Sequence, residues 1–196
     1  VEVAEVIDLG AAVEAEAAAL RKRYGAVVLI GHSMGGTLST IAAAEGYADR
    51  LILCAPYFGV TYKAQYLLPP ETWVDLLKPA VVWVRKTDTY IMVNRKEAKP
   101  EIETYRWLPL SAVDMLNGLG DRGKREETLS RITCPVLFLH STGDEAASFT
   151  ESRKAFDAIA STDKTFHELK ASNHHLFFDY EREETIAAIV AFLGKP

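Results

Sequence analysis

Residues 26–36 read AVVLIGHSMGG. The apolar, mostly β-branched start of this stretch predicts a strand that is buried on both faces of a parallel sheet. The strand runs into the pattern G-x-S-x-G centred on Ser33, and residues 34–46 are small and compatible with a helix. This setting predicts a sharp strand-to-helix turn that lifts the Ser33 hydroxyl clear of the sheet as a nucleophile. The same turn places the N–H of Met34 at a helix N-terminus, where it can donate to a developing oxyanion.

The composition is that of one ordinary globular domain. The chain has 196 residues, of which 48% are hydrophobic and 25% charged, enough for a single sizeable core. Its net charge of −5 gives no electrostatic reason to expect nucleic acid or an anionic membrane surface as partner. No apolar run approaches the ~20 residues of a transmembrane helix, and the acidic first residues are unlike a signal peptide.

The two cysteines are expected to be free thiols. Cys54 lies near the C-terminal end of one predicted strand and Cys134 at the N-terminal end of another. These ends are opposite edges of a parallel sheet, too far apart for a disulfide. Two buried free thiols fit a reducing compartment and favour the cytoplasm.

Strand and helix patterns alternate along most of the chain, which predicts an α/β fold with a parallel sheet. Residues 57–110 break this rhythm, because they hold all three tryptophans, five of the eight tyrosines and five prolines. We therefore divide the chain into a core of residues 1–56 and 111–196 and an inserted subdomain of residues 57–110. The expected strands are 26–31, 50–55, 135–139 and 164–169, and the expected helices are 2–24, 34–46, 111–130, 148–160 and 182–193.

A serine nucleophile needs a base and an orienting acid, which follow it in the order acid, then histidine, in this kind of fold. Asp144 comes directly after the third predicted strand, so it projects from the same sheet edge as Ser33; Glu145 is its nearest rival. The loop after the last strand offers two adjacent candidates for the base, His174 and His175. The sequence contains no pattern typical of a metal site, a dinucleotide site or a P-loop, so no metal or cofactor is expected.

Three blocks carry a family resemblance: GHSMGG at 31–36, PVLFLHSTGD at 135–144 and SNHHLFFDYERE at 172–183. Together they resemble the serine α/β-hydrolases of the monoacylglycerol-lipase and small bacterial carboxylesterase type. The resemblance implies a three-layer fold, and a catalytic histidine followed five residues later by an acidic residue. His174 has that spacing to Asp179, so the resemblance selects His174 over His175 as the base.

The resemblance also implies that residues 57–110 form a cap over an apolar pocket. It implies a serine esterase that cleaves small-molecule carboxylic esters with apolar acyl groups through an acyl-enzyme. We expect its substrate to contact some of the residues in or near the cap, although the cap aromatics can equally form a small core of their own. Acyltransferase or thioesterase activity, or a truncated binding protein with little turnover, are the alternatives. The candidate contacts are His32, Tyr57, Phe58, Trp83 and Trp107.

Members of that family carry several strands before the nucleophile, and a loop, often with His-Gly, that supplies a second oxyanion donor. This chain has only a predicted helix there, so we expect an N-terminally shortened fold in which strand 26–31 is a sheet edge. Bare edge strands pair readily with other chains. We therefore expect the edge to be covered by a second copy in a homo-oligomer, by a separate N-terminal segment or by helix 2–24. A backbone N–H near Tyr57 and Phe58 is the candidate for the missing donor.

Overall fold

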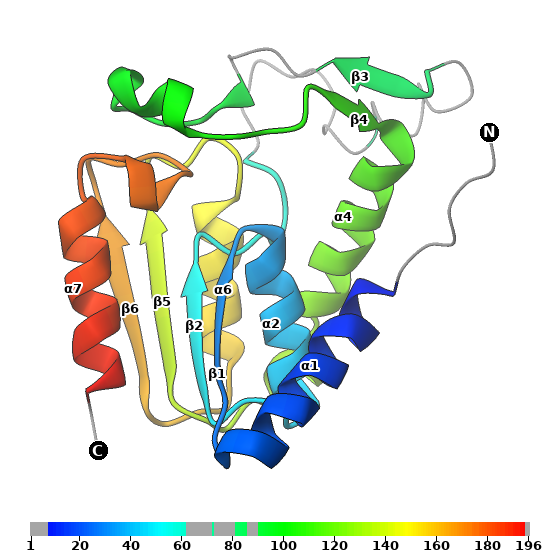
Figure 1. Cartoon of the computed structure of the whole chain (residues 1–196), viewed down its shortest axis with the longest axis vertical. Coiled ribbons are helices and arrows are strands. Elements are labelled where there is room, and N and C mark those ends of the chain that lie inside the picture. The colour runs from blue at the N-terminus through cyan, green and yellow to red at the C-terminus, as the bar shows by residue number, and fades with distance from the viewer. Residues whose placement is uncertain (1–7, 62–71, 73–80, 86–89, 195–196) are drawn as a thin grey trace.

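The computed structural model describes residues 8–61, 72, 81–85 and 90–194. Its centre is a four-stranded parallel sheet in the order β1-β2-β5-β6, with helices on both faces (Figure 1). This three-layer α/β arrangement confirms the predicted fold class. The strands are β1 (Val28–His32), β2 (Arg50–Cys54), β5 (Val136–Ser141) and β6 (Lys164–Leu169).

The helices lie close to the predicted ranges, with one exception. The expected helix 111–130 is two helices, because Arg125 adopts an extended backbone conformation between them. None of the described helices is long and apolar enough to cross a membrane. The helices are α1 (Leu9–Tyr24), α2 (Met34–Ala44), α4 (Leu110–Gly123), α5 (Glu126–Leu129), α6 (Phe149–Ala158) and α7 (Arg182–Leu193).

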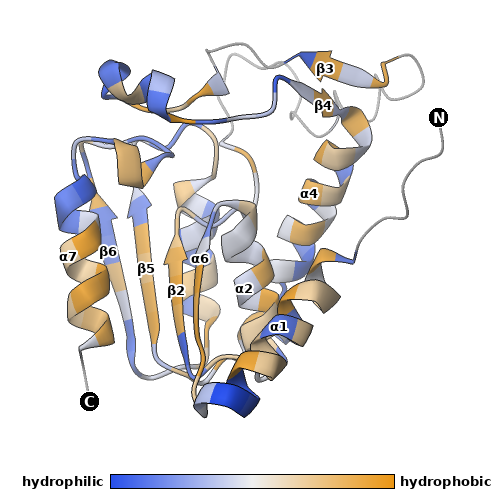
Figure 2. Cartoon of the chain, viewed as in Figure 1, coloured by the Kyte–Doolittle hydropathy of each residue, from blue (hydrophilic) through white to orange (hydrophobic). Residues whose placement is uncertain are grey.

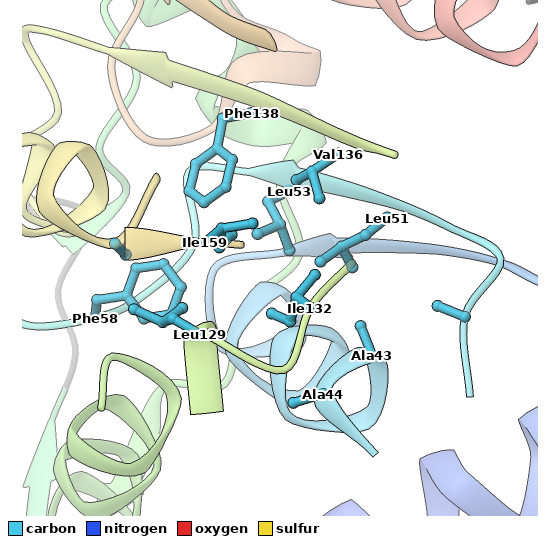
Figure 3. Close-up of a cluster of buried hydrophobic side chains, with 12 residues drawn as sticks. Ala43, Ala44, Leu51, Leu53, Phe58, Leu129, Ile132, Val136, Phe138 and Ile159 are labelled. Carbon is cyan, nitrogen blue, oxygen red and sulfur yellow. The ribbon is translucent and has the colours of Figure 1, made fainter. Parts of the chain in front are cut away.

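Alternate residues of the central strands fill two separate hydrophobic clusters. Leu51 and Leu53 of β2 face one side of the sheet, where side chains from α2, α5 and α6 meet them (Figure 3). Ile52 and Cys54 face the other side, where α7 packs. Both sides of β2 are therefore apolar, and Figure 2 shows β2 and β5 as largely hydrophobic, in contrast to β6.

The two cysteines are free, and they lie at opposite ends of neighbouring strands. Cys54 is buried at the C-terminal end of β2, and burial raises the pKa of its thiol to about 12. Cys134, which precedes β5, is only partly buried, so the expectation of two buried thiols was wrong for this residue. It lies at the end of the strand, where the sheet no longer covers it fully.

Strand β1 lies at one edge of the described sheet and pairs with β2 alone. The side chain of Ile30 is 51% exposed there. Helix α1 packs against α2 and ties itself to the β1–β2 layer through an Arg21–Asp49 ion pair of 2.9 Å. The described part of this helix therefore leaves Ile30 uncovered. A second copy or a separate N-terminal segment at this edge stays a prediction.

Part of the inserted segment is described. Strands β3 (Trp83–Arg85) and β4 (Trp107–Pro109) form an antiparallel pair that lies beyond the C-terminal ends of the parallel strands (Figure 1). A 3-10 helix, η2 (Lys96–Glu101), lies between them in sequence. Much of 57–110, including Trp73, lies outside the described residues, and the division into core and cap stays a prediction.

Two glycines of α4 allow this helix to approach the layer that carries Ser33. A Cβ added at Gly123 would lie 2.7 Å from Thr37 Cγ2 of α2 and 3.2 Å from the Phe58 ring. A Cβ at Gly120 would lie 3.3 Å from the Tyr57 ring. At Gly118, one turn earlier and exposed, an added Cβ meets no described atom within 4 Å. The three glycines of α4 therefore differ in how closely they are packed.

This difference can be tested within one helix. Gly118→Ala should raise the free energy of unfolding by ~0.5–1 kcal/mol, because alanine is the better helix former and nothing obstructs its methyl group. Gly123→Ala should lower it by ~1–3 kcal/mol, because the methyl group overpacks the contact with Thr37. Urea unfolding of the two variants measures both values. Equal effects of the two substitutions would contradict the close approach of α4 to α2.

Candidate active site

Ser33 occupies the turn between β1 and α2 in a strained conformation. Its φ of 54° and ψ of −123° lie in a region that residues other than glycine rarely adopt. A Cβ at Gly31 would come within 2.3 Å of the Gly35 carbonyl oxygen, so this position needs glycine. At Gly35 itself an added Cβ meets no described atom within 4 Å. Of the two glycines of the motif, only Gly31 is therefore required by a close backbone approach.

Backbone hydrogen bonds hold this turn from the neighbouring strand. The Ser33 N–H donates to the Cys54 carbonyl oxygen at 3.1 Å, and the Tyr57 N–H donates to the Ser33 carbonyl oxygen at 3.1 Å. The N–H of Gly36 also donates to the Ser33 carbonyl, at 2.9 Å. Strain of a few kcal/mol persists only where surrounding structure holds it, and these bonds supply that structure.

The structure brings Ser33, His174 and Asp144 together in one hydrogen-bonded chain. His174 Nε2 lies 2.9 Å from Ser33 Oγ, and His174 Nδ1 lies 2.8 Å from Asp144 Oδ2. Asp144 follows β5 and His174 follows β6, so both reach Ser33 from the C-terminal edge of the sheet. His174 and Asp144 are buried, with exposures of 6% and 4%. A serine, an imidazole and a carboxylate in this order can activate the hydroxyl as a nucleophile.

His175 and Glu145, the rival candidates, lie beside the hydrogen-bonded Ser33–His174–Asp144 triad. The His175 N–H donates to the Met92 carbonyl oxygen at 3.1 Å, and its ring centroid lies 5.4 Å from that of His174. The Glu145 N–H donates to Asn173 Oδ1 at 3.0 Å. His174 and Asp144 are thus the members of each pair that hydrogen-bond toward Ser33.

Asp144 is held by four donors. Its Oδ1 accepts from the N–H groups of Ala146 and Ala147, both at 2.8 Å. Its Oδ2 accepts from His174 and also from His140 Nε2, at 3.1 Å. Burial alone would raise the pKa of Asp144, but the bonds from His140 and His174 outweigh it and hold the pKa well below its usual range. The carboxylate is therefore charged at neutral pH and oriented on both oxygens.

His140 is a site residue that sequence reasoning missed. It is not among the candidate residues of the sequence analysis, yet its side chain is fully buried and donates to Asp144. Its spacing of four residues before Asp144 was the available signal. Because the chain turns back directly after β5, the side chain of His140 in this strand can reach the carboxylate of Asp144.

His32, expected to contact substrate, instead lies against the backbone of the base. Its Nε2 donates to the His174 carbonyl oxygen at 2.9 Å, and the two ring centroids are 4.8 Å apart. Burial, and then the nearby His174, lower the pKa of His32 to about 4. His32 is therefore neutral at pH 7 and keeps one nitrogen free of a proton.

The other expected substrate contacts are scattered. Phe58 is fully buried in the core cluster, so its expected contact with substrate is wrong; packing between α4, α5 and β5 takes up its ring. Tyr57 is nearly buried, and its hydroxyl donates to Asn117 Oδ1 at 2.7 Å. Trp83 and Trp107 lie on the β3–β4 pair with exposures of 56% and 58%.

The start of α2 offers backbone N–H groups that can donate to an oxyanion. The first N–H groups of a helix, here those of Met34 and Gly35, have no acceptor within the helix. The expected second donor near Tyr57 and Phe58 is not the Tyr57 N–H, because this group already donates to the Ser33 carbonyl oxygen. Among the described residues, no group of three or more His, Cys, Asp or Glu is placed to hold a metal ion.

Comparison with known proteins gives a family and several similar folds. The profile of the family described as "Serine aminopeptidase, S33" matches residues 5–181. A structure reported with LipS and LipT, two metagenome-derived lipolytic enzymes, is 21% identical with a TM-score of 0.78, over 94% of this chain and 71% of the other. A monoacylglycerol lipase from Paleococcus ferrophilus is 20% identical with a TM-score of 0.76, over 94% and 74% of the two chains. A soluble variant of the monoglyceride lipase from Saccharomyces cerevisiae is 17% identical with a TM-score of 0.77, over 95% and 67%.

The lowered pKa of His32 predicts how stability depends on pH. Between about pH 6.5 and pH 4 the unfolded chain binds a proton at this position that the folded chain does not bind. The free energy of unfolding should therefore fall by about 2 kcal/mol from pH 7.5 to pH 5 because of His32. The depressed pKa of Asp144 acts in the same direction at lower pH, since its contribution is lost below the pKa of an unfolded aspartate.

Urea unfolding at pH 7.5 and pH 5.0 measures this fall for the original protein and for His32→Gln. Glutamine keeps an N–H donor for the His174 carbonyl oxygen but does not titrate. The fall should therefore be smaller in the variant. An equal fall in both proteins would show that His32 is not the group responsible.

Proposed function

This chain belongs to the serine aminopeptidase S33 family of α/β hydrolases, and on that premise we propose that it is a serine esterase. It cleaves carboxylic esters with apolar acyl groups through an acyl-enzyme. The observation that supports this proposal is the chain Ser33 Oγ–His174 Nε2 at 2.9 Å and His174 Nδ1–Asp144 Oδ2 at 2.8 Å, on a strained turn at a helix start. Serine alone is a weak nucleophile, and this arrangement supplies both groups that activate it.

The proposed reaction has two halves. In the first, His174 takes the proton from Ser33 as Oγ attacks the ester carbonyl, and the alcohol leaves with that proton. In the second, His174 takes a proton from water as the water oxygen attacks the acyl-enzyme carbonyl, and it then gives that proton to Ser33 Oγ as the acyl–Oγ bond breaks and the acid leaves. Asp144 holds the imidazole in one tautomer and stabilises its charged form in both halves. The Met34 N–H donates to the oxyanion.

Two observations favour an ester over a peptide as the substrate: the reactions of structurally similar enzymes and the aromatic composition of the inserted segment. The three similar structures named above are lipolytic enzymes or monoglyceride lipases. The inserted segment is rich in aromatic side chains, which suit an apolar acyl group. Four described members of this set are at least half exposed: Trp83, Tyr90, Tyr105 and Trp107.

The proposal predicts which side chains p-nitrophenyl butyrate hydrolysis needs. Ser33→Ala and His174→Ala should each lose kcat by a factor of at least about 10³, because each removes a member of a unit that acts together. Asp144→Asn should lower kcat by about 10⁴, since it favours the wrong histidine tautomer. The initial rate of nitrophenolate release measures all three.

His175→Ala is the matched control, because it removes the neighbouring imidazole without touching the Ser33–His174–Asp144 chain. It should keep kcat within about tenfold of the original. A dead His175→Ala variant beside an active His174→Ala variant would reverse the assignment of the base. Faster cleavage of alanine p-nitroanilide than of the ester would favour the aminopeptidase reading of the family description. Binding of a fluorophosphonate without any turnover of esters would favour a binding protein.

A further inference from the structure

We propose that Asp179 is a positioning residue that joins the His174 loop to residues 91–95 of the inserted segment. The base and this part of the insertion then behave as one rigid unit during the reaction. The functional half of this inference rests on the proposed role of His174 as base; the structural half does not. The proposal also divides the predicted 57–110 cap in two, because residues 91–95 would move with the core and not with the rest of the cap.

The Asp179 carboxylate is buried, at 1% exposure, and accepts four backbone hydrogen bonds. Its Oδ2 accepts from the N–H groups of Asn94 at 2.8 Å and Asn173 at 2.7 Å. Its Oδ1 accepts from the N–H groups of Arg95 and Tyr180, both at 2.9 Å. Two of these donors belong to the insertion and one to the residue before the base, so a single side chain connects the two segments.

Further contacts cross the same junction. The His175 N–H donates to the Met92 carbonyl oxygen at 3.1 Å, and Asn94 Nδ2 donates to the Ala171 carbonyl oxygen at 2.9 Å. Asn173 Nδ2 donates to Asn94 Oδ1 at 3.2 Å. Phe178, next to Asp179, packs against a small apolar cluster in the insertion that consists of Ile91, Val93, Ala98 and Ile102.

The connection continues to the acid side of the site. Asn173 Oδ1 accepts from the N–H groups of His174 at 2.9 Å and Glu145 at 3.0 Å. Asn173, which Asp179 holds, therefore contacts His174 itself and Glu145, the neighbour of Asp144. Separating residues 91–95 from Asp179 would leave a buried carboxylate with half of its donors missing, which is costly. The segment therefore stays docked while substrate enters and leaves.

Glu181 provides a matched control in the same turn. Its carboxylate also binds the His174 loop, through the N–H groups of Lys170 at 2.8 Å, Ala171 at 2.9 Å and Ser172 at 2.8 Å. All of these donors lie on the loop side of the junction. Glu181→Gln and Asp179→Asn each remove one negative charge and loosen the His174 loop. Only Asp179→Asn also separates this loop from residues 94–95 of the insertion.

The first measurement is steady-state ester hydrolysis against pH. Asp179→Asn replaces one acceptor oxygen with an NH₂ group, which cannot accept the backbone N–H bonds made there. The His174 loop should therefore shift, and kcat should fall by about 10- to 100-fold with little change in KM. The acid limb of the kcat/KM profile should move to lower pH, because a slackened Asp144 bond stabilises the imidazolium less. Glu181→Gln should keep kcat within about twofold and leave the limb in place. If the variant only lowered the amount of folded protein, the apparent kcat would fall but the pH of the acid limb of the kcat/KM profile would not change.

The second measurement is deuterium uptake by backbone amides, which needs no substrate. Asp179→Asn should raise uptake at 91–95 and at 173–176 together, whereas Glu181→Gln should raise it only at 170–172. Asn94→Ala, at an exposed position, breaks the same junction from the insertion side and serves if Asp179→Asn does not fold. It should raise uptake in both segments and lower kcat less than Asp179→Asn does.

Two results would overturn the inference: unchanged uptake at 91–95 in both Asp179→Asn and Asn94→Ala, or an equal loss of kcat in Glu181→Gln and Asp179→Asn. If the original protein cleaves no ester, the proposed function fails, and the uptake experiment alone still decides whether Asp179 joins the two segments.

Discussion

The strained backbone of Ser33 is the constraint on which the rest of the structure depends. A φ of 54° at a serine is stable only because β2 accepts its N–H and the Tyr57 N–H binds its carbonyl. Both partners come from the end of β2 and the residues just after it, so the turn exists only when β1 and β2 are paired. Gly31, and Gly120 and Gly123 of α4, serve the same constraint, because a side chain at any of these positions would crowd the turn or the elements that support it.

The parallel sheet then gathers the other groups. Asp144 and His174 are far from Ser33 in sequence, but β5 and β6 run in the same direction as β1 and end at the same edge. A buried carboxylate with donors on both oxygens holds the imidazole from one side. The His32 side chain and the Asp179 carboxylate hold the backbone of the same loop from other directions. The geometry of the base is thus overdetermined, as a site that must be accurate within a fraction of an ångström requires.

The parts of the site that could be predicted are those that a short, continuous sequence pattern specifies. Apolar runs and turn residues gave the strands, the elbow and the strand ends at which Asp144 and His174 lie. The contacts that could not be predicted join segments distant in sequence through side chains with no local pattern. His32 against the His174 carbonyl and Asp179 across to residues 94–95 are of this kind. The same limit explains Phe58, whose position after a strand pointed to the site although long-range packing draws its ring into the core.

The register of the sheet also sets the order in which the molecule can assemble. Leu29 pairs with Leu51 across a short βαβ connection, whereas Leu51 pairs with Val136, which lies beyond the whole insertion. Closing the longer loop costs more chain entropy and is slower, because non-local contacts are rewarded only after that cost is met. The Ser33 turn can therefore form while β5 and β6 are still undocked. The proposed acid and base, Asp144 and His174, arrive only with β5 and β6, so under the proposed function catalytic competence is the final property that a refolding chain acquires.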